Sequence, residues 1–219
     1  MNIVSRTNRL RDKMLLLMSF ILLAVLIDLL LIYLIPEYFK VPIKFSSIRK
    51  VPKIDPLYYK IGIVLFSPLA EELVFRSILV INSKNIKLWI SSVLGIIVYL
   101  FFFKSGYIVA FTLLGISFSI SYLLLNKMKE IEVNPRYTGK KFTYILLILS
   151  SMLFALAHFK FNLDNYDLRY ILRLVDFILI AFMLGIIRIK CGLRWSIIMH
   201  SLKNLYCIFL PSLYFLIFR

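Results

Sequence analysis

Seven apolar segments run along the chain, and their lengths constrain its fold more than any other feature. A helix needs about 20 apolar residues to cross a lipid bilayer, with a range near 17–25. The third segment is shorter than this range, and the other six fall within it. The segments are Met14–Ile35, Tyr59–Ile81, Leu88–Phe103, Tyr107–Leu125, Phe142–Phe159, Tyr170–Ile187 and Trp195–Phe218. We therefore predict an all-α fold, a polytopic transmembrane helical bundle that forms a single integral membrane domain over residues 1–219.

The stretch between the first two apolar segments leaves the helix count at about seven or eight. Residues 36–60 are rich in proline and lysine, and they form either an interfacial segment or a further membrane element. The first apolar segment, Met14–Ile35, is too long for the apolar region of a signal peptide and lacks a small-residue cleavage site. We interpret it as a retained anchor helix.

Composition and charge agree with a membrane location. Hydrophobic residues make up 61% of the chain, whereas soluble domains are about 45–50% apolar. The net charge of +16 comes from basic residues that fall mostly between apolar segments, as in loops that face anionic lipid. No basic patch with interleaved aromatic residues lies outside these segments, which argues against nucleic acid as a partner. The Lys and Arg distribution favours an N-terminus inside, and the Ile-, Lys- and Asn-rich composition predicts a multi-pass protein of the bacterial cytoplasmic membrane.

Three charged residues interrupt the second apolar segment, in the stretch SPLAEELVFRSILV. Each costs about 2.5–3.5 kcal/mol at the centre of a bilayer unless it is paired or faces a water-filled cavity. Glu72 and Arg76 are four residues apart on one helical face and can form an ion pair. Glu71 lies about 100° round the helix from Glu72, so a structural salt bridge explains the pair but not Glu71. Pro68, one turn earlier, is expected to kink the helix.

Both histidines of the chain lie in apolar segments. His158 follows Phe154 by one turn, and His200 precedes Asn204 by one turn. A lone histidine on an apolar helix is more often a packing residue, but two such histidines together with Glu71 favour a functional site. If their helices start at the same depth, counting 1.5 Å per residue places His158 roughly 16 Å deeper than His200.

The remaining charges inside the apolar segments have simpler interpretations. Arg173 and Asp176 are three residues apart and read as a structural bridge. We interpret Asp28 and Lys203 as interfacial or pore-facing residues.

The chemistry of these groups allows two kinds of site. A carboxylate shielded from bulk water can act as a general base toward a water molecule, and a histidine can orient that water or carry its proton. A histidine N–H and an asparagine amide one turn apart can both donate to a developing oxyanion. The same residues also suit a zinc site with two histidines and one glutamate as ligands and an open position for water.

Three motifs carry a resemblance to a known family. EELVFR (Glu71–Arg76), FALAH (Phe154–His158) and HSLKN (His200–Asn204) resemble the EExxxR, FxxxH and HxxxN motifs of the CAAX proteases and bacteriocin-processing enzymes, the CPBP or Abi family. The stretch GIIRIKCGLRWSIIMHSLKNL (Gly185–Leu205) also looks like this family's approach to its third motif. The resemblance covers residues 67–205, which would form the core of the membrane domain.

The resemblance implies an intramembrane endopeptidase acting on a membrane-associated peptide or protein, either a CAAX-type tail or a bacteriocin- or pheromone-like precursor. Glu71 and His158 would activate a water molecule, His200 and Asn204 would form the oxyanion hole, and Glu72, Arg76 and Phe154 would support the site. The family favours a glutamate mechanism without a cofactor. If the enzyme depends on zinc instead, the ligands would be Glu71, His158 and His200.

Two other functions compete with this one. The first is a non-catalytic membrane partner, such as a bacteriocin-immunity factor or a regulator of a sensor kinase, that keeps the motifs as a scaffold. The second is a proton-coupled transporter, but the sequence lacks the inverted repeat typical of that class.

Overall fold

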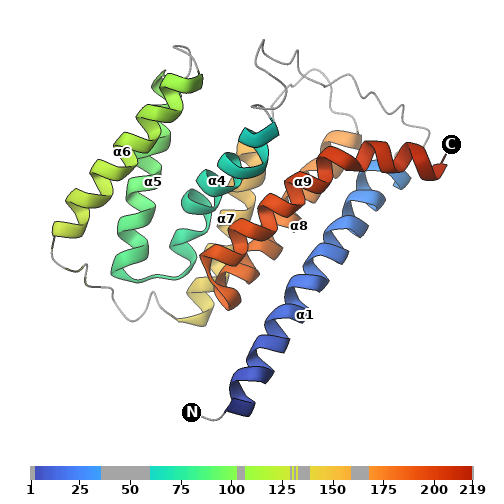
Figure 1. Ribbon diagram of the computed structural model, residues 1–219, viewed down its shortest axis with the longest axis horizontal. Coiled ribbons are helices and arrows are strands. Elements are labelled where there is room, and N and C mark those ends of the chain that lie inside the picture. Colours follow the sequence, from blue (N-terminus) through green and yellow to red (C-terminus); the bar gives the residue numbers. More distant parts are fainter. Residues whose placement is uncertain are drawn as a thin grey trace. The chain divides into compact units, whose positions relative to one another are not determined.

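A computed structural model describes residues 3–35, 60–102, 107–128, 130, 132, 139–158 and 168–218. These residues form seven α-helices with short π and 3-10 turns and no strand, which confirms the predicted all-α bundle (Figure 1). They divide into two compact units, one of Met1–Pro68 with Ser150–Arg219 and the other of Leu69–Leu149. Residues 36–59, which include most of the predicted interfacial or additional membrane segment, lie outside the described part.

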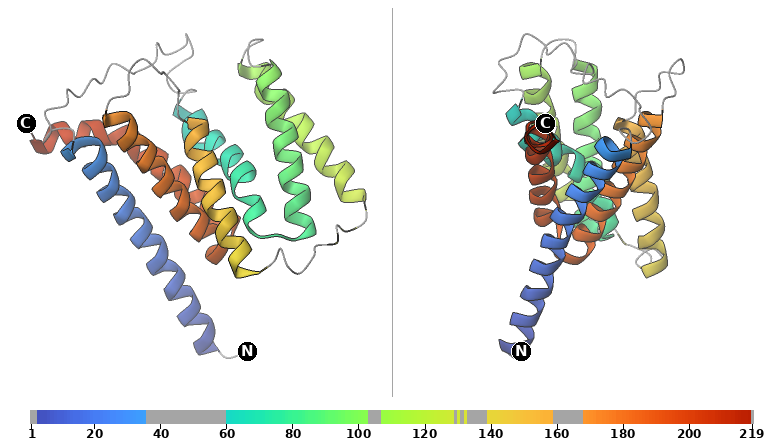
Figure 2. Two further views of the ribbon diagram at one scale, coloured as in Figure 1. Left: turned by 180° about the vertical axis from the view of Figure 1, so that it is seen from behind. Right: turned by 90° about the vertical axis from the view of Figure 1, so that its right-hand side faces the viewer.

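The first unit is built from α1 (Ile3–Asp28), the end of α7 (Lys140–His158), α8 (Leu168–Cys191) and α9 (Leu193–Phe218). Helix α1 packs against α8 and α9, and α8 lies beside α9 (Figures 1 and 2). The predicted segment Met14–Ile35 falls on α1 and on the π turn that continues it, Leu29–Leu34, and α1 begins earlier than predicted, at Ile3. Its role as a retained anchor stays a prediction.

A single residue separates α8 from α9. Gly192 has a φ of 100°, a left-handed conformation that glycine adopts without a Cβ penalty. Its N–H donates to the carbonyls of Ile187 and Arg188 at 3.2 and 3.1 Å, which closes the last turn of α8. The Ser196 hydroxyl then donates to the carbonyl of Leu184 at 3.1 Å. The two helices therefore form a tight hairpin that is tied by a side chain as well as by its turn.

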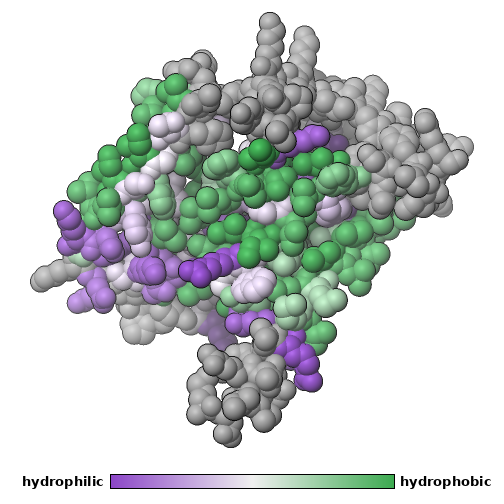
Figure 3. All heavy atoms as spheres, viewed as in Figure 1, coloured by the Kyte–Doolittle hydropathy of each residue, from purple (hydrophilic) through white to green (hydrophobic). Residues whose placement is uncertain are grey.

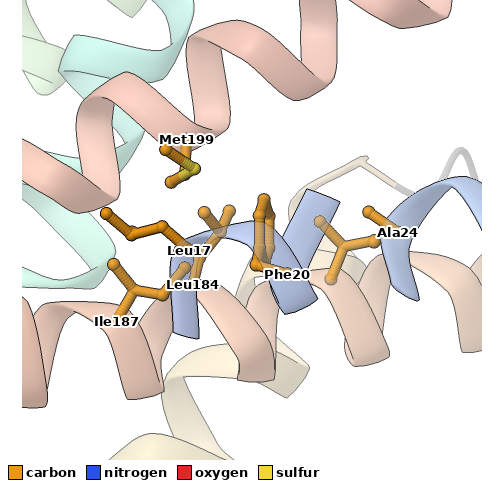
Figure 4. Packing of buried hydrophobic residues seen from close by; sticks show 7 residues of the cluster. Leu17, Phe20, Ala24, Leu184, Ile187 and Met199 are labelled. Carbon is orange, nitrogen blue, oxygen red and sulfur yellow. The ribbon is translucent and has the colours of Figure 1, made fainter. Parts of the chain in front are cut away.

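A cluster of buried apolar side chains joins the three long helices of this unit (Figure 4). Because lipid tails are as apolar as leucine, such contacts in a membrane stabilise through close packing and dispersion rather than through removal from water. The cluster consists of Leu17, Phe20, Ala24, Ile180, Leu184, Ile187 and Met199. It ends at Met199, next to the third-motif histidine.

The chain approaching the first motif is less regular than predicted. A π-helical turn, Gly62–Phe66, precedes α4 (Ser67–Phe75), and a 3-10 turn, Ser77–Leu79, follows it. The predicted apolar segment Tyr59–Ile81 is therefore helical from its first described residue, Lys60, but it is not one regular α-helix, and its α-helical part ends at Phe75. Pro68 accounts for the π turn because its ring crowds the carbonyl one turn earlier and it lacks an N–H. At the other end the Ser77 hydroxyl donates to the carbonyl of Leu73.

The second unit is dominated by α5 (Ser83–Phe102) packed against α6 (Tyr107–Lys127) (Figure 1). The predicted start of this helix at Leu88 is wrong, since Asn82 caps an earlier first turn by accepting from Asn85 N–H at 2.8 Å. Lys87, predicted to lie in a loop, is 5% exposed inside the helix. Its ammonium donates to the Met128 carbonyl at 2.9 Å, just beyond the end of α6.

The described helices expose apolar side chains to their surroundings (Figure 3). Leu22 on α1, for example, is 63% exposed. Within the described residues, four helical stretches are long and apolar enough to cross a membrane, namely Arg11–Leu31, Ser83–Phe102, Lys140–His158 and Tyr170–Cys191. An exposed apolar surface of this extent needs lipid around it, so the protein is an integral membrane protein.

Candidate active site

His158 is the last residue of α7, and the backbone fixes the state of its ring. Its Nδ1 lies 2.8 Å from the carbonyl oxygen of Phe154, one turn earlier. A carbonyl can only accept, so Nδ1 carries the hydrogen and donates it. In a neutral imidazole, Nε2 is then the ring atom that can accept a proton. This tautomer suits a residue that orients or deprotonates a water molecule.

The Phe154 ring contacts the histidines of two different motifs. Its centroid lies 4.4 Å from that of His158 and 5.7 Å, edge to face, from that of His200. Phe177 of α8 also packs against the His158 ring, with the two ring centroids 5.1 Å apart. The predicted depth mismatch between the two histidines is therefore wrong, because both touch one side chain. Helix α7 begins further from the site than α9, contrary to the assumption that the two start at one depth.

Asn204 lies one turn after His200 on α9, as predicted, but its amide has a partner that the sequence did not indicate. Its Nδ2 donates to the backbone carbonyl of Ile63 at 2.9 Å. Ile63 belongs to the π turn before Pro68, which packs against α9. A sequence pattern cannot show which backbone carbonyl a side chain will contact. Pro68 did indicate, however, that a carbonyl about one turn earlier would lack its usual N–H donor.

Lys203 and Asp28 form a buried ion pair beside the third motif. Lys203 Nζ lies 3.0 Å from Asp28 Oδ2, and the two side chains are 11% and 0% exposed. The interpretation of both as interfacial or pore-facing is wrong, because each charge is neutralised by the other. Cys207 completes the group, with its sulfur 3.0 Å from Lys203 Nζ. Asp176 of α8 lies close enough to Asp28 and Lys203 to interact with both. The predicted bridge between Arg173 and Asp176 is wrong, since no ion pair within 4.0 Å joins these two described residues.

The first motif, Glu71–Arg76, lies on the end of α4 and the residue that follows it, in the second unit. Glu72 and Arg76 are both fully buried, and Arg76 Nε lies 4.0 Å from Glu72 Oε1. The spacing of four residues therefore produces the ion pair expected on one helical face. Glu71 is half-buried and interacts electrostatically with Arg76. The meeting of Glu71 with the two histidines, which belong to the first unit, stays a prediction.

Neither unit groups three metal-binding side chains in its described residues. Within each unit, no set of three described His, Cys, Asp or Glu side chains is placed to hold one ion. The zinc set predicted from the sequence, Glu71 with His158 and His200, draws on both units and stays a prediction.

These features define the class of the protein: an integral membrane protein in which a buried histidine, His200, and paired charges lie among apolar helices, with the exposed His158 beside them. Residues 123–206 match the model of a protein family described as type II CAAX prenyl endopeptidase Rce1-like. This segment is therefore similar to the CAAX-protease family that the chain's motifs resemble. The matched segment contains the second and third motifs, and the first motif precedes it. No curated protein and no solved structure matches the chain. The family supports a membrane endopeptidase of the CAAX type.

Proposed function

We propose that the protein hydrolyses a peptide bond in a membrane-associated substrate, either a CAAX-type tail or a bacteriocin- or pheromone-like precursor. One observation carries the proposal: the buried Phe154 ring contacts both His158 and His200, the histidines of two different motifs. The Rce1-like match supports the same class of reaction. We place the enzyme in a bacterial cytoplasmic membrane with its N-terminus inside, which the distribution of Lys and Arg favours.

In the proposed reaction, Glu71 takes a proton from a water molecule that His158 Nε2 orients. The water oxygen attacks the carbonyl carbon of the scissile bond, and the carbonyl oxygen becomes an anion. The N–H of His200 and the amide of Asn204 donate to that oxyanion. The proton held by Glu71 then passes to the amide nitrogen, the C–N bond breaks, and a carboxylic acid and an amine are released, between which the remaining proton of the attacking water is exchanged to give a carboxylate and an ammonium group.

The ion pair of Glu72 with Arg76 would support this chemistry by holding the helix that carries Glu71. Both side chains are fully buried, and removing either would leave the other as an uncompensated buried charge. The pair is therefore proposed as support for the site rather than as a participant in the reaction.

We propose that the reaction needs no cofactor, as the family resemblance implies. The zinc alternative would use Glu71, His158 and His200 as ligands. Treating the purified enzyme with 1,10-phenanthroline separates the two, since a glutamate mechanism keeps its rate. A rate that is lost and then restored by added zinc would establish the metal mechanism instead.

The decisive experiment compares peptides in membranes and medium of cells that carry the wild-type protein, Glu71→Gln or Glu130→Gln. Glu130 is exposed, so the same substitution there is a matched control. An unprocessed precursor that accumulates only with Glu71→Gln identifies both the activity and the substrate. If all three profiles agree and Glu71→Gln still complements a deletion, the protein is a non-catalytic membrane partner, such as an immunity factor or a sensor-kinase regulator.

A further inference from the structure

A backbone N–H is missing just after the π turn that precedes the first motif, and this affects Asn204 of the third motif. In a π turn each N–H donates to the carbonyl five residues earlier, and Ser67 N–H does so to Gly62 O. In this register the next bond would run from residue 68 to Ile63 O. Residue 68 is proline, which has no N–H. The carbonyl of Ile63 therefore needs a donor from elsewhere.

Asn204 supplies that donor from α9. Its Nδ2 lies 2.9 Å from Ile63 O, although the two residues are 141 positions apart in the chain. A backbone carbonyl left without a donor among packed helices costs about 1–3 kcal/mol, so such a bond is favoured. The amide group carries two hydrogens. With one of them fixed on Ile63 O, the plane of the amide and the direction of the second hydrogen are fixed as well.

We propose that Pro68 is a positioning residue for the candidate active site. By lacking an N–H it leaves Ile63 O to accept from Asn204, and this bond aims the second amide hydrogen toward the developing oxyanion. The catalytic part of this inference rests on the proposed endopeptidase function. The structural part, a joint between α9 and the turn that leads into α4, does not depend on it.

A double-mutant cycle on thermal stability tests the joint. Asn204→Ala leaves Ile63 O without its donor and should lower the denaturation temperature of the purified protein by roughly 2–12 °C. In a Pro68→Ala background, the restored N–H at residue 68 can serve that carbonyl. The same Asn204→Ala change should then cost less than half as much. Asn126→Ala, at an exposed position, is the matched control and should leave the temperature unchanged.

An equal cost of Asn204→Ala in both backgrounds would overturn the joint. If Asn204→Ala alone fails to accumulate in membranes, accumulation of the double variant becomes the readout. Rescue by Pro68→Ala supports the joint, and failure of both variants overturns it.

Kinetics test the positioning role separately. Pro68→Ala should lower kcat about 10-fold with KM unchanged, a smaller loss than the 10²–10³-fold that follows removal of an oxyanion donor. If Pro68→Ala keeps the full kcat while the stability cycle shows that Pro68 and Asn204 are coupled, the positioning role is refuted. The contact between Asn204 and Ile63 would then be purely structural. A wild-type protein that cleaves no peptide would refute the proposed function, while the stability cycle would still decide the joint.

Discussion

Replacing Lys203 with methionine should destabilise the first unit more than any single change to its carboxylate partners. Lys203 Nζ lies 3.0 Å from Asp28 Oδ2, and the ammonium also interacts with Asp176. Lys203→Met therefore leaves Asp28 and its neighbour Asp176 without their shared cation. Breaking a buried pair in this way costs about 3–5 kcal/mol. For a chain of this length we expect a fall of roughly 6–20 °C in denaturation temperature.

Asp28→Asn should cost clearly less than Lys203→Met. The amide keeps the shape of the carboxylate, and Asp176 remains to balance the ammonium. We expect a loss of about 1.5–3 kcal/mol, the contribution of a hydrogen bond to a charged group. The double variant Asp28→Asn with Lys203→Met should recover part of the loss caused by Lys203→Met, because one carboxylate fewer is left uncompensated.

The assay is the fraction of detergent-solubilised protein that stays monodisperse after heating to a series of temperatures. Two results would refute the reasoning. Equal losses for Asp28→Asn and Lys203→Met would mean an isolated pair, with Asp176 taking no part. A loss below about 1 kcal/mol for Lys203→Met would mean that the pair behaves like one on a wet surface.

Substitutions at three further positions test other parts of the structure. Gly192→Ala should cost about 1–2 kcal/mol because the residue has a φ of 100°, which the same heating assay would detect as a lower denaturation temperature. Gly95→Ala should be nearly neutral, since a Cβ there would lie 3.4 Å from Leu114 O and Phe118 Cβ. Gly95→Leu should separate α5 from α6 and cost about 1–3 kcal/mol, so equal denaturation temperatures for the two variants would contradict the close approach. Phe154→Leu should lower kcat with little change in KM, because it removes the aromatic contacts that hold both imidazoles. The measurement is peptide-cleavage kinetics. A normal kcat in this variant would mean that the Phe154 ring only fills space.

The helical architecture was accessible from the sequence because it follows from local patterns. A run of apolar residues long enough to span a bilayer must form a helix, since only internal hydrogen bonds satisfy its backbone there. The boundaries were less accessible. The polar residues that begin α5 resemble a loop, yet the Asn82 cap and the bond from Lys87 to the Met128 carbonyl allow them to be helical.

The contacts between distant segments that complete the site could not be predicted from local sequence patterns. The spacing of four residues between Glu72 and Arg76 predicts their ion pair, because it places both side chains on one helical face. Asp28 and Lys203 are 175 positions apart, and no periodicity relates them until α1 and α9 pack together. The bond between Asn204 and Ile63 involves a backbone acceptor, so even a complete list of polar side chains would have missed it.

The one-residue turn between α8 and α9 has a consequence for the entropy of catalysis. With Gly192 as the whole connection and Ser196 bonded to the Leu184 carbonyl, α9 cannot slide or rotate without carrying α8 along. His200 and Asn204 are therefore held in place before any substrate arrives. In the proposed reaction, little free energy would then be needed to order the oxyanion donors during the encounter with substrate, and the hairpin would act as a rigid template for the transition state.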